Sequence, residues 1–277
     1  MPLPGNDAVG ALSTVTTRYE DTLPDIARAH DLGYLEISEA NPGVDPWLPG
    51  ADLELVIPSQ FLLPPGPREG IVINLAELRL YYYPKGENRV ITHPLGIGRE
   101  GWSTPVGSAR ITGKKANPSW TPPESIRKEH AEQGDPLPPV VGPGPDNPLG
   151  DYALYLSLPG YLLHGTNKPW GVGMRVSHGC IRLYPEDIEP LFPRVPTNTP
   201  VRIINEPYKL GWIDGRLYLE AHQPLSEERL NQGVDFARLN QAIAQALAER
   251  NADIDWKKVR SAAFAPLGYP VPISLGP

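Results

Sequence analysis

The stretch SHGCIRL, residues 177–183, holds the only cysteine in a chain of 277 residues. Successive side chains of an extended strand point to opposite faces, so an extended CIRL places Cys180 and Arg182 on one face and Ile181 and Leu183 on the other. The apolar pair then faces a core, while the thiol and the guanidinium share a cleft. The stretch therefore predicts a strand that carries a reactive group beside a binding group.

Two histidines lie near the cysteine in the sequence, His178 in SHGC and His164 in LLHGTNKPW. An imidazole can take the proton of a thiol and return it to a leaving group. His164 ends an expected strand, and the following loop is long enough to set it against Cys180. Gly165 and Gly179 allow close backbone approach, and the amides of Gly179 and Cys180 are candidates to face a developing oxyanion.

Other interpretations of these residues stay open. A zinc site from His164, His178 and Cys180 lacks an obvious fourth ligand and any C-x2-C pair. The histidines are alternatively core residues, and the cysteine a buried structural thiol. We favour a Cys–His nucleophilic site that uses no metal or other cofactor. The fork of donors on Arg182 suits a substrate carboxylate, and a surface salt bridge explains Arg182 equally well.

Composition excludes several classes of protein. Hydrophobic residues make up 40% and charged residues 21% of the chain, as in globular proteins. A net charge of -7 argues against a nucleic-acid-binding surface. The sequence has no apolar run of about 18 residues, so we expect no transmembrane segment. A single cysteine excludes an intrachain disulfide and avoids mispairing in an oxidising compartment.

Residues 13–58 predict a small βααβ module. STVTTR alternates like a strand, and DTLPDIARAH predicts a helix with Thr22 as N-cap and Asp25 three residues on. LGYLEISEANPG predicts a second helix that ends at an Asn-Pro-Gly stop. LPGADLELVIP predicts a turn followed by a closing strand.

From Ile71 the pattern changes to short strands that are rich in Val, Ile and Tyr, such as IVINL, LRLYYY and ARITGKK. They predict an antiparallel β-rich domain. Residues 116–149 interrupt it with a Pro-rich segment that is too long for a simple hairpin. Trp120 and an expected short helix around 124–131 favour an ordered lid. After Pro207, a hairpin and the helix in DFARLNQAIAQALAER predict a small α+β C-terminal subdomain.

HGTNKPWGVGMRVSHGCIRLYPEDI resembles the signature of the L,D-transpeptidases with a YkuD-type catalytic domain, and TPVGSARI resembles the Thr-Pro-x-Gly strand of that family. The resemblance covers residues 68–207 and implies a mostly β, β-sandwich-like catalytic domain. It implies that Cys180 is the nucleophile, that His164 is the general base and acid, and that His178 helps to order the site. The expected substrate-binding residues are Arg182, Ser177, Gly179, Gly165 and Trp120.

EDTLPDIA, ISEANPGV and LPGADLELVIP resemble a LysM domain, with Glu20 where that family usually has Gly. This implies that residues 13–60 bind N-acetylglucosamine-containing glycans such as peptidoglycan; a scaffold that binds nothing is the alternative. The expected order is the LysM-like module, the catalytic domain 68–207 with its lid 116–149, and the subdomain 208–277. This order resembles periplasmic enzymes of Gram-negative bacteria, which implies a mature chain after a removed signal peptide.

The resemblance implies a reaction. Cys180 attacks a peptidoglycan tetrapeptide stem at diaminopimelate, D-Ala leaves, and an amine resolves the thioester. The expected amine is the C-terminal Lys of an outer-membrane lipoprotein, as in the enzymes that attach Braun lipoprotein. The leaving D-Ala carries the carboxylate that Arg182 is expected to meet, and carbapenems are expected to acylate the same cysteine.

Three alternatives to lipoprotein attachment stay open. Diaminopimelate of a second stem is an alternative acceptor, which gives a 3→3 cross-link. Water is another, which makes the protein a hydrolase. A non-enzymatic peptidoglycan-binding protein is the alternative from a different class, although a pure binder has no use for an ordered Cys–His signature.

Overall fold

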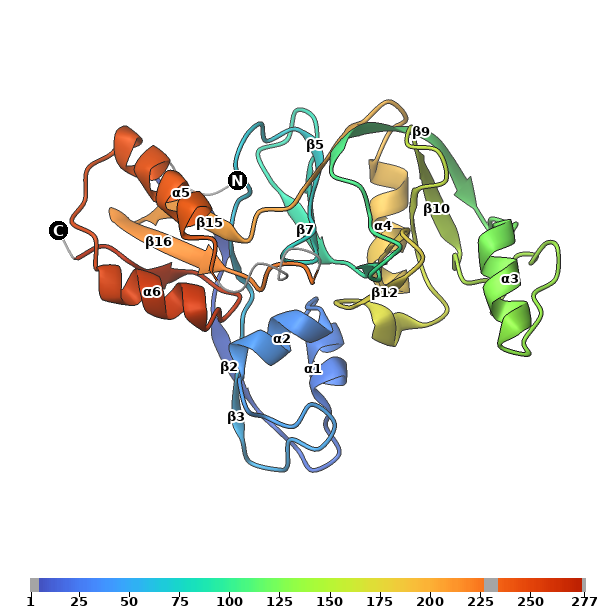
Figure 1. Cartoon of the computed structure of the whole chain (residues 1–277), viewed down its shortest axis with the longest axis horizontal. Helices are drawn as coiled ribbons and strands as arrows, with labels where there is room; N and C mark the ends of the chain where they lie inside the picture. The colour runs from blue at the N-terminus through green and yellow to red at the C-terminus, as the bar shows by residue number, and fades with distance from the viewer. Residues whose placement is uncertain (1–4, 227–233, 276–277) are drawn as a thin grey trace.

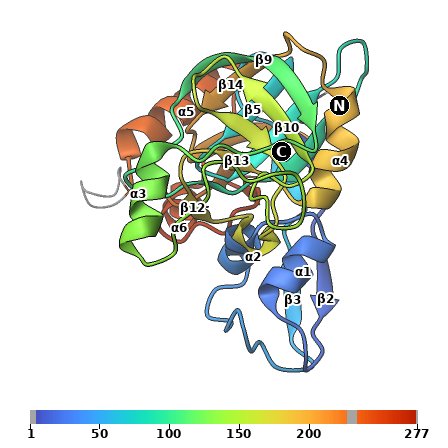
Figure 2. The ribbon, with the colours of Figure 1, turned by 90° about the vertical axis from the view of Figure 1, so that its right-hand side faces the viewer.

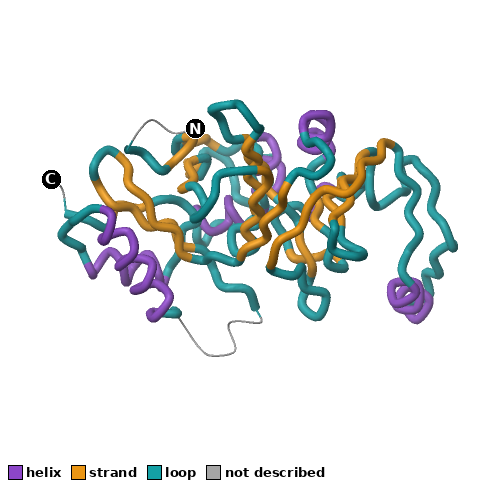
Figure 3. Tube along the Cα trace, turned by 90° about the horizontal axis from the view of Figure 1, so that it is seen from above, coloured by secondary structure: helices purple, strands orange, loops and turns teal. Residues whose placement is uncertain are grey.

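The computed structural model describes residues 5–226 and 234–275. Its centre is one eight-stranded sheet, flanked by the lid helix at one end of the long axis and the C-terminal helices at the other (Figures 1 and 3). The strands, in spatial order, are β13 (Ile181–Arg182), β11 (Leu162–His164), β10 (Tyr152–Leu156), β9 (Gly107–Ala116), β14 (Pro200–Ile204), β5 (Gly70–Asn74), β6 (Arg79–Tyr83) and β7 (Ile91–Pro94).

The mostly β catalytic domain is confirmed, with one correction to its strand directions. Two neighbouring pairs, β11 with β13 and β14 with β5, are parallel rather than antiparallel. Parallel neighbours need a crossover connection, and the long loop after His164 provides one for β13. The sheet curls around a single core (Figure 2), so the two layers of the expected sandwich are two halves of one sheet.

Helix α4 (Pro185–Arg194) covers part of this core with Ile188 and Leu191, which are both 1% exposed. Pro185 suits the first turn because it lacks the N–H that a helix start leaves unpaired. A separate two-stranded pair, β8 (Ile97–Gly98) with β12 (Arg175–Ser177), leads the chain into residues 177–183. The SHGC segment is therefore held between two sheets.

The N-terminal part has the expected order strand, helix, helix, strand. β2 (Ser13–Thr16) pairs antiparallel with β3 (Glu54–Ile57), and α1 (Leu23–Ala29) and α2 (Tyr34–Ala40) lie between them in the chain. The Thr22 side chain accepts a hydrogen bond from the Asp25 amide at 3.2 Å, as an N-cap does. A short outer pair, β1 (Ala8–Gly10) with β4 (Gln60–Leu62), links this part to the rest of the chain.

The N-terminal part is joined to the catalytic sheet by a buried ion pair. Glu36 of α2 contacts the Arg79 Nε of β6 at 2.6 Å, and both side chains are almost fully buried. The second Glu36 oxygen accepts from the Gly33 amide at 2.6 Å, which closes a capping box at the start of α2. Because this buried ion pair is fully hydrogen-bonded, it fixes one orientation of the N-terminal part relative to the catalytic sheet.

The C-terminal part contains the expected hairpin, β15 (Tyr208–Ile213) and β16 (Arg216–Ala221), whose turn residues Asp214 and Gly215 have φ of 46° and 82°. Positive φ at both positions is what a two-residue hairpin turn requires. The expected helix is α5 (Phe236–Glu249). Sequence analysis missed α6 (Trp256–Phe264) and β17 (Val271–Pro272), which complete a small core with the hairpin.

The expected lid contains helix α3 (Glu124–Glu132), and it is closed at its base. Trp120 and Val141 exchange two backbone hydrogen bonds of 2.8 Å. The fully buried Asn147 donates to the carbonyls of Pro118 and Gly142. The lid is therefore a tied loop with its own hydrogen bonds. Within the described residues, no helix is long and apolar enough to cross a membrane.

Candidate active site

The pairing of β11 with β13 brings the predicted residues together. Leu163 lies opposite Ile181, and His164 lies opposite Arg182. Leu163, Ile181 and the next alternate residue, Leu183, have no exposed surface. The alternation predicted from CIRL is confirmed: the apolar side chains enter the core, and Cys180 and Arg182 line a cavity on the other face.

That cavity has a volume of about 410 Å³. His164, His178 and Ser177 line it together with Cys180 and Arg182. The lid contributes to its lining, as the sequence predicted for Trp120; the other lid side chains include Ile126 and Leu149. The cavity is only partly enclosed, and Cys180 within it is partly exposed.

Cys180 is a protonated thiol in this environment. Its Sγ lies 3.7 Å from the Gly160 carbonyl, which only accepts hydrogen bonds. Burial raises the pKa of the thiol, and a hydrogen bond from the Leu162 backbone and the charge of Arg182 oppose the rise. The same two groups are therefore positioned to stabilise a thiolate once the proton leaves.

His164 is held as one tautomer. Its Nδ1 lies 2.5 Å from the Gly165 carbonyl oxygen, so Nδ1 carries the hydrogen and Nε2 keeps its lone pair. The side chain is 3% exposed. Burial, and then the charge of Arg182, lower the pKa of His164 to about 3, which leaves the ring neutral. A neutral imidazole is a proton acceptor, and the backbone carbonyls of Gly165 and Leu149 beside the ring oppose the fall in its pKa.

Arg182 is a partly buried cation that lacks a counter-ion among the described residues. Burial lowers its pKa, and its Nε has no hydrogen-bond partner in the described part of the chain. No ion pair to it occurs among residues 5–226 and 234–275. The surface salt bridge that competed with carboxylate binding is therefore wrong for Arg182. An unpaired guanidinium inside a cavity is suited to an anionic ligand.

Ser177 and Gly179 shape the turn before the cysteine. The Ser177 hydroxyl donates to the Cys180 carbonyl at 2.6 Å and accepts from the Gly179 amide at 3.2 Å. This corrects the expectation for the oxyanion, because the Gly179 amide already has a partner. Gly179 has φ of 100°, and a Cβ there would lie 3.1 Å from the Tyr161 ring. Glycine is required at this position by both conformation and space.

His178 is held by residues that sequence analysis did not single out. Its Nε2 lies 3.0 Å from Glu129 of the lid and 3.2 Å from Arg99, which itself contacts Glu129 at 2.5 Å. The Trp102 ring meets His178 edge-to-face, with 5.0 Å between ring centres. No local pattern links Glu129 to His178 across 49 residues. His164, His178 and Cys180 also do not form a grouping of metal-ligand atoms among the described residues.

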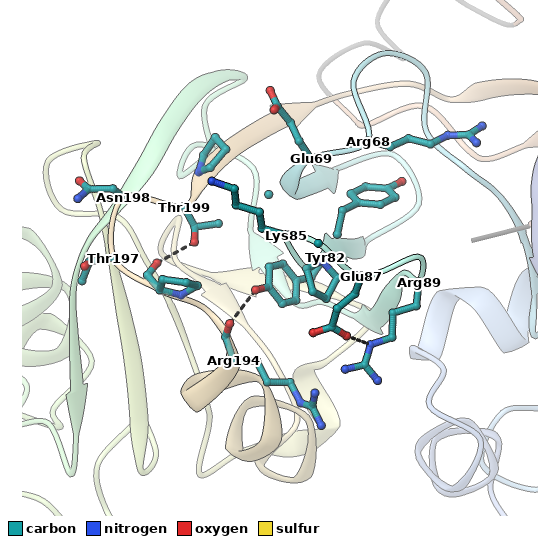
Figure 4. Close-up of a pocket in the computed structure, with 16 residues that line it drawn as sticks. Arg68, Glu69, Tyr82, Lys85, Glu87, Arg89, Arg194, Thr197, Asn198 and Thr199 are labelled. Carbon is teal, nitrogen blue, oxygen red and sulfur yellow. Dashed lines mark hydrogen bonds and ion pairs between the residues drawn. The ribbon is translucent and has the colours of Figure 1, made fainter.

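A larger cavity, of about 710 Å³, lies away from the cysteine (Figure 4). Its lining includes Lys85 and the ion pair between Glu87 and Arg89, which lie in an exposed loop, and Arg194 at the end of α4. None of its lining residues is a cysteine or a histidine. Size alone does not make it the reactive site, since the groups needed for nucleophilic chemistry line the smaller cavity.

Comparison with known proteins identifies the family of this chain. Residues 68–203 match the L,D-transpeptidase catalytic domain family, YkuD. "Probable L,D-transpeptidase YcfS" of Escherichia coli K12 is 51% identical over 75% of this chain, and the chain spans 66% of that relative. "Probable L,D-transpeptidase YbiS" of the same strain is 48% identical over 82% of this chain and 75% of the relative. "Probable L,D-transpeptidase ErfK/SrfK" of Salmonella typhimurium LT2 is 41% identical over 99% and 91%.

Proposed function

This chain belongs to the L,D-transpeptidase family and is an acyltransferase of that class, and from this premise we propose that it works through a thioester on Cys180. The observation that carries the proposal is the pair of neutral groups in one cavity: a protonated thiol, and an imidazole whose Nε2 is left to accept its proton. Ser177 and Gly179 shape the turn that presents the thiol.

The first half of the reaction uses groups on two strands. His164 Nε2 takes the Cys180 proton as the sulfur attacks the carbonyl between diaminopimelate and the terminal D-Ala of a tetrapeptide stem. The carbon–nitrogen bond breaks, and the same proton passes to the departing D-Ala nitrogen. The D-Ala carboxylate binds Arg182, the partly buried cation that has no counter-ion among the described residues. The thioester remains on the cysteine.

An amine resolves the thioester in the second half of the reaction. The preferred acceptor is the C-terminal Lys of an outer-membrane lipoprotein. Diaminopimelate of another stem as the acceptor would give a cross-link, and water would give hydrolysis. The proposal favours aminolysis over hydrolysis because the apolar lid side chains of Trp120 and Leu149 line the cavity in which the thioester forms. Because the proposed substrate is peptidoglycan, we propose that the enzyme works in the periplasm.

The N-terminal part, residues 13–60, is in this proposal a LysM-like module that holds the glycan. Its loops expose large apolar side chains: Tyr19 is 81% exposed, Trp47 56% and Leu48 78%. Exposed aromatic rings offer flat apolar faces to a sugar. Binding of insoluble peptidoglycan should weaken in Trp47→Ala, and unchanged binding would argue for a scaffold.

Mass spectrometry of products tests the proposal. The protein is mixed with a diaminopimelate-containing disaccharide-tetrapeptide, with and without a peptide that ends in Lys. A mass increase on Cys180 with loss of D-Ala, and then a tripeptide–Lys conjugate, is the expected result. A tripeptide–tetrapeptide dimer would mean cross-linking, and loss of D-Ala alone would mean hydrolysis. Absence of acylation, by substrate or by a carbapenem, would overturn the thioester mechanism.

A further inference from the structure

His178 has a defined protonation state that the acylation step does not use. Its Nε2 contacts the Glu129 carboxylate at 3.0 Å, and a carboxylate accepts but does not donate. Nε2 therefore carries the hydrogen, and the lone pair is on Nδ1. Arg99 Nη2 also lies 3.2 Å from His178 Nε2, but Arg99 has only donors and its shorter contact, at 2.5 Å, is with the other Glu129 oxygen. His178 and His164 thus line one cavity as opposite tautomers.

The acyl acceptor brings a proton that must be removed. A lysine-type amine is an ammonium ion at neutral pH, and only the neutral amine attacks a thioester. In the proposed function His164 Nε2 already exchanges its proton with the sulfur and the leaving nitrogen, so the ammonium needs a second acceptor. Among the residues that line the cavity, Arg182 is the only charged one. The carboxylate that adjoins this cavity through His178 is Glu129.

We propose, on the basis of the proposed function, that Glu129 and His178 form a dyad that accepts the proton of the incoming ammonium. The ammonium gives one proton to His178 Nδ1, and Glu129 stabilises the resulting imidazolium. The neutral amine then attacks the thioester carbon, the new carbon–nitrogen bond forms, and the carbon–sulfur bond breaks. The second amine proton passes through His164 to the sulfur, which restores the thiol, and His178 releases its proton to solvent.

Three charged groups face His178 and decide its response to pH. Glu129 lies on the lid helix α3, Arg99 follows β8, and Arg182 lies on β13. Hydrogen bonds from Arg99, and then from His178, lower the pKa of Glu129, so its carboxylate stays ionised. Partial burial lowers the pKa of His178, and Glu129 opposes that fall. A glutamine at position 129 removes the opposing charge but keeps the size of the side chain.

The dyad makes Glu129 a positioning residue whose loss affects one half of the reaction. In Glu129→Gln, formation of the acyl-enzyme from tetrapeptide should stay within about twofold of the parent, while transfer to a Lys-ended peptide at neutral pH should fall about 100-fold. Transfer should recover at high pH, and with hydroxylamine, which is already neutral at pH 7. Glu129→Asp should retain part of the activity.

The matched control is Glu132→Gln, on the same helix, whose carboxylate lies 3.9 Å from Lys128 and which should behave like the parent. Acyl-enzyme and products are followed by mass spectrometry in one time course. Equal loss with hydroxylamine and with lysine would mean a displaced lid and would overturn the dyad, as would unchanged transfer to lysine. Failure of the parent to form an acyl-enzyme would overturn the proposed function, which is a separate outcome.

Discussion

His164 and Arg182 lie opposite each other in the parallel pairing of β11 with β13, so an imidazole and a guanidinium project from the same face of the sheet. The cation helps to keep the imidazole neutral. The guanidinium in turn has no anion beside it among the described residues. This register therefore places the base, His164, beside the binding group, Arg182, which follows Cys180 by two residues in the chain.

Arg182→Gln should weaken acylation by the tetrapeptide. A charge-assisted hydrogen bond contributes about 1.5–3 kcal/mol, so kcat/KM should fall about 10- to 100-fold. A tetrapeptide whose terminal carboxylate is amidated provides the control. Amidation should lower kcat/KM of the parent by the same factor of about 10- to 100-fold, and it should leave kcat/KM of Arg182→Gln unchanged. If the variant still prefers the free carboxylate as strongly as the parent does, Arg182 does not bind it.

The free enzyme should lack a thiolate at neutral pH. Burial raises the pKa of Cys180, and the low pKa of His164, about 3, prevents a stable imidazolium partner. The rate of alkylation by iodoacetamide should therefore rise throughout the range from about pH 6 to 9. A preformed thiolate–imidazolium pair would react at a constant rate above about pH 4. Because Cys180 is the only cysteine, the label reports one site.

The features that could be predicted from the sequence depend on residues close to one another in the chain. Ile181 and Leu183 are buried because a strand alternates, and Thr22 caps α1 because its hydroxyl reaches the Asp25 amide. Both relations span three residues or fewer. The length of the loop after His164 made this histidine a candidate partner of Cys180, but no periodicity places it beside Arg182.

Contacts between distant segments could not be predicted in this way. Glu129 reaches His178 across 49 residues, and Lys209 reaches Glu77 across 132. In its own segment of the sequence, each of these charged residues has the pattern of a solvent-exposed side chain. The parallel direction of β13 was also missed, because short strands of the same composition form both kinds of pair.

Lys209→Met should unfold more easily than the parent by about 3–5 kcal/mol. Lys209 Nζ lies 2.5 Å from Glu77 and 2.7 Å from Glu220, and none of the three side chains is exposed. Removal of the cation leaves the buried Glu77 without its nearest counter-ion, while Glu220 keeps His222 at 2.9 Å. Urea unfolding measures the change, and Lys257→Met, at an exposed position, is the control. Adding Glu77→Gln should recover part of the loss; no recovery would mean that packing, not charge, is responsible.

Gly173→Ala should separate the N-terminal part from the active-site loop. The α2 amide of Leu35 donates to the Gly173 carbonyl at 3.2 Å, and a Cβ on Gly173 would lie 2.1 Å from the Tyr34 nitrogen. Gly43 has a similar φ, 84° against 78°, but open space around it. In both alanine variants the left-handed backbone should lower the free energy of unfolding by about 1–2 kcal/mol, as measured with urea.

Transfer of the acyl group should fall only in Gly173→Ala, because the loop that contains Gly173 leads to Cys180. Equal transfer in the two variants would mean that the N-terminal part does not position the site.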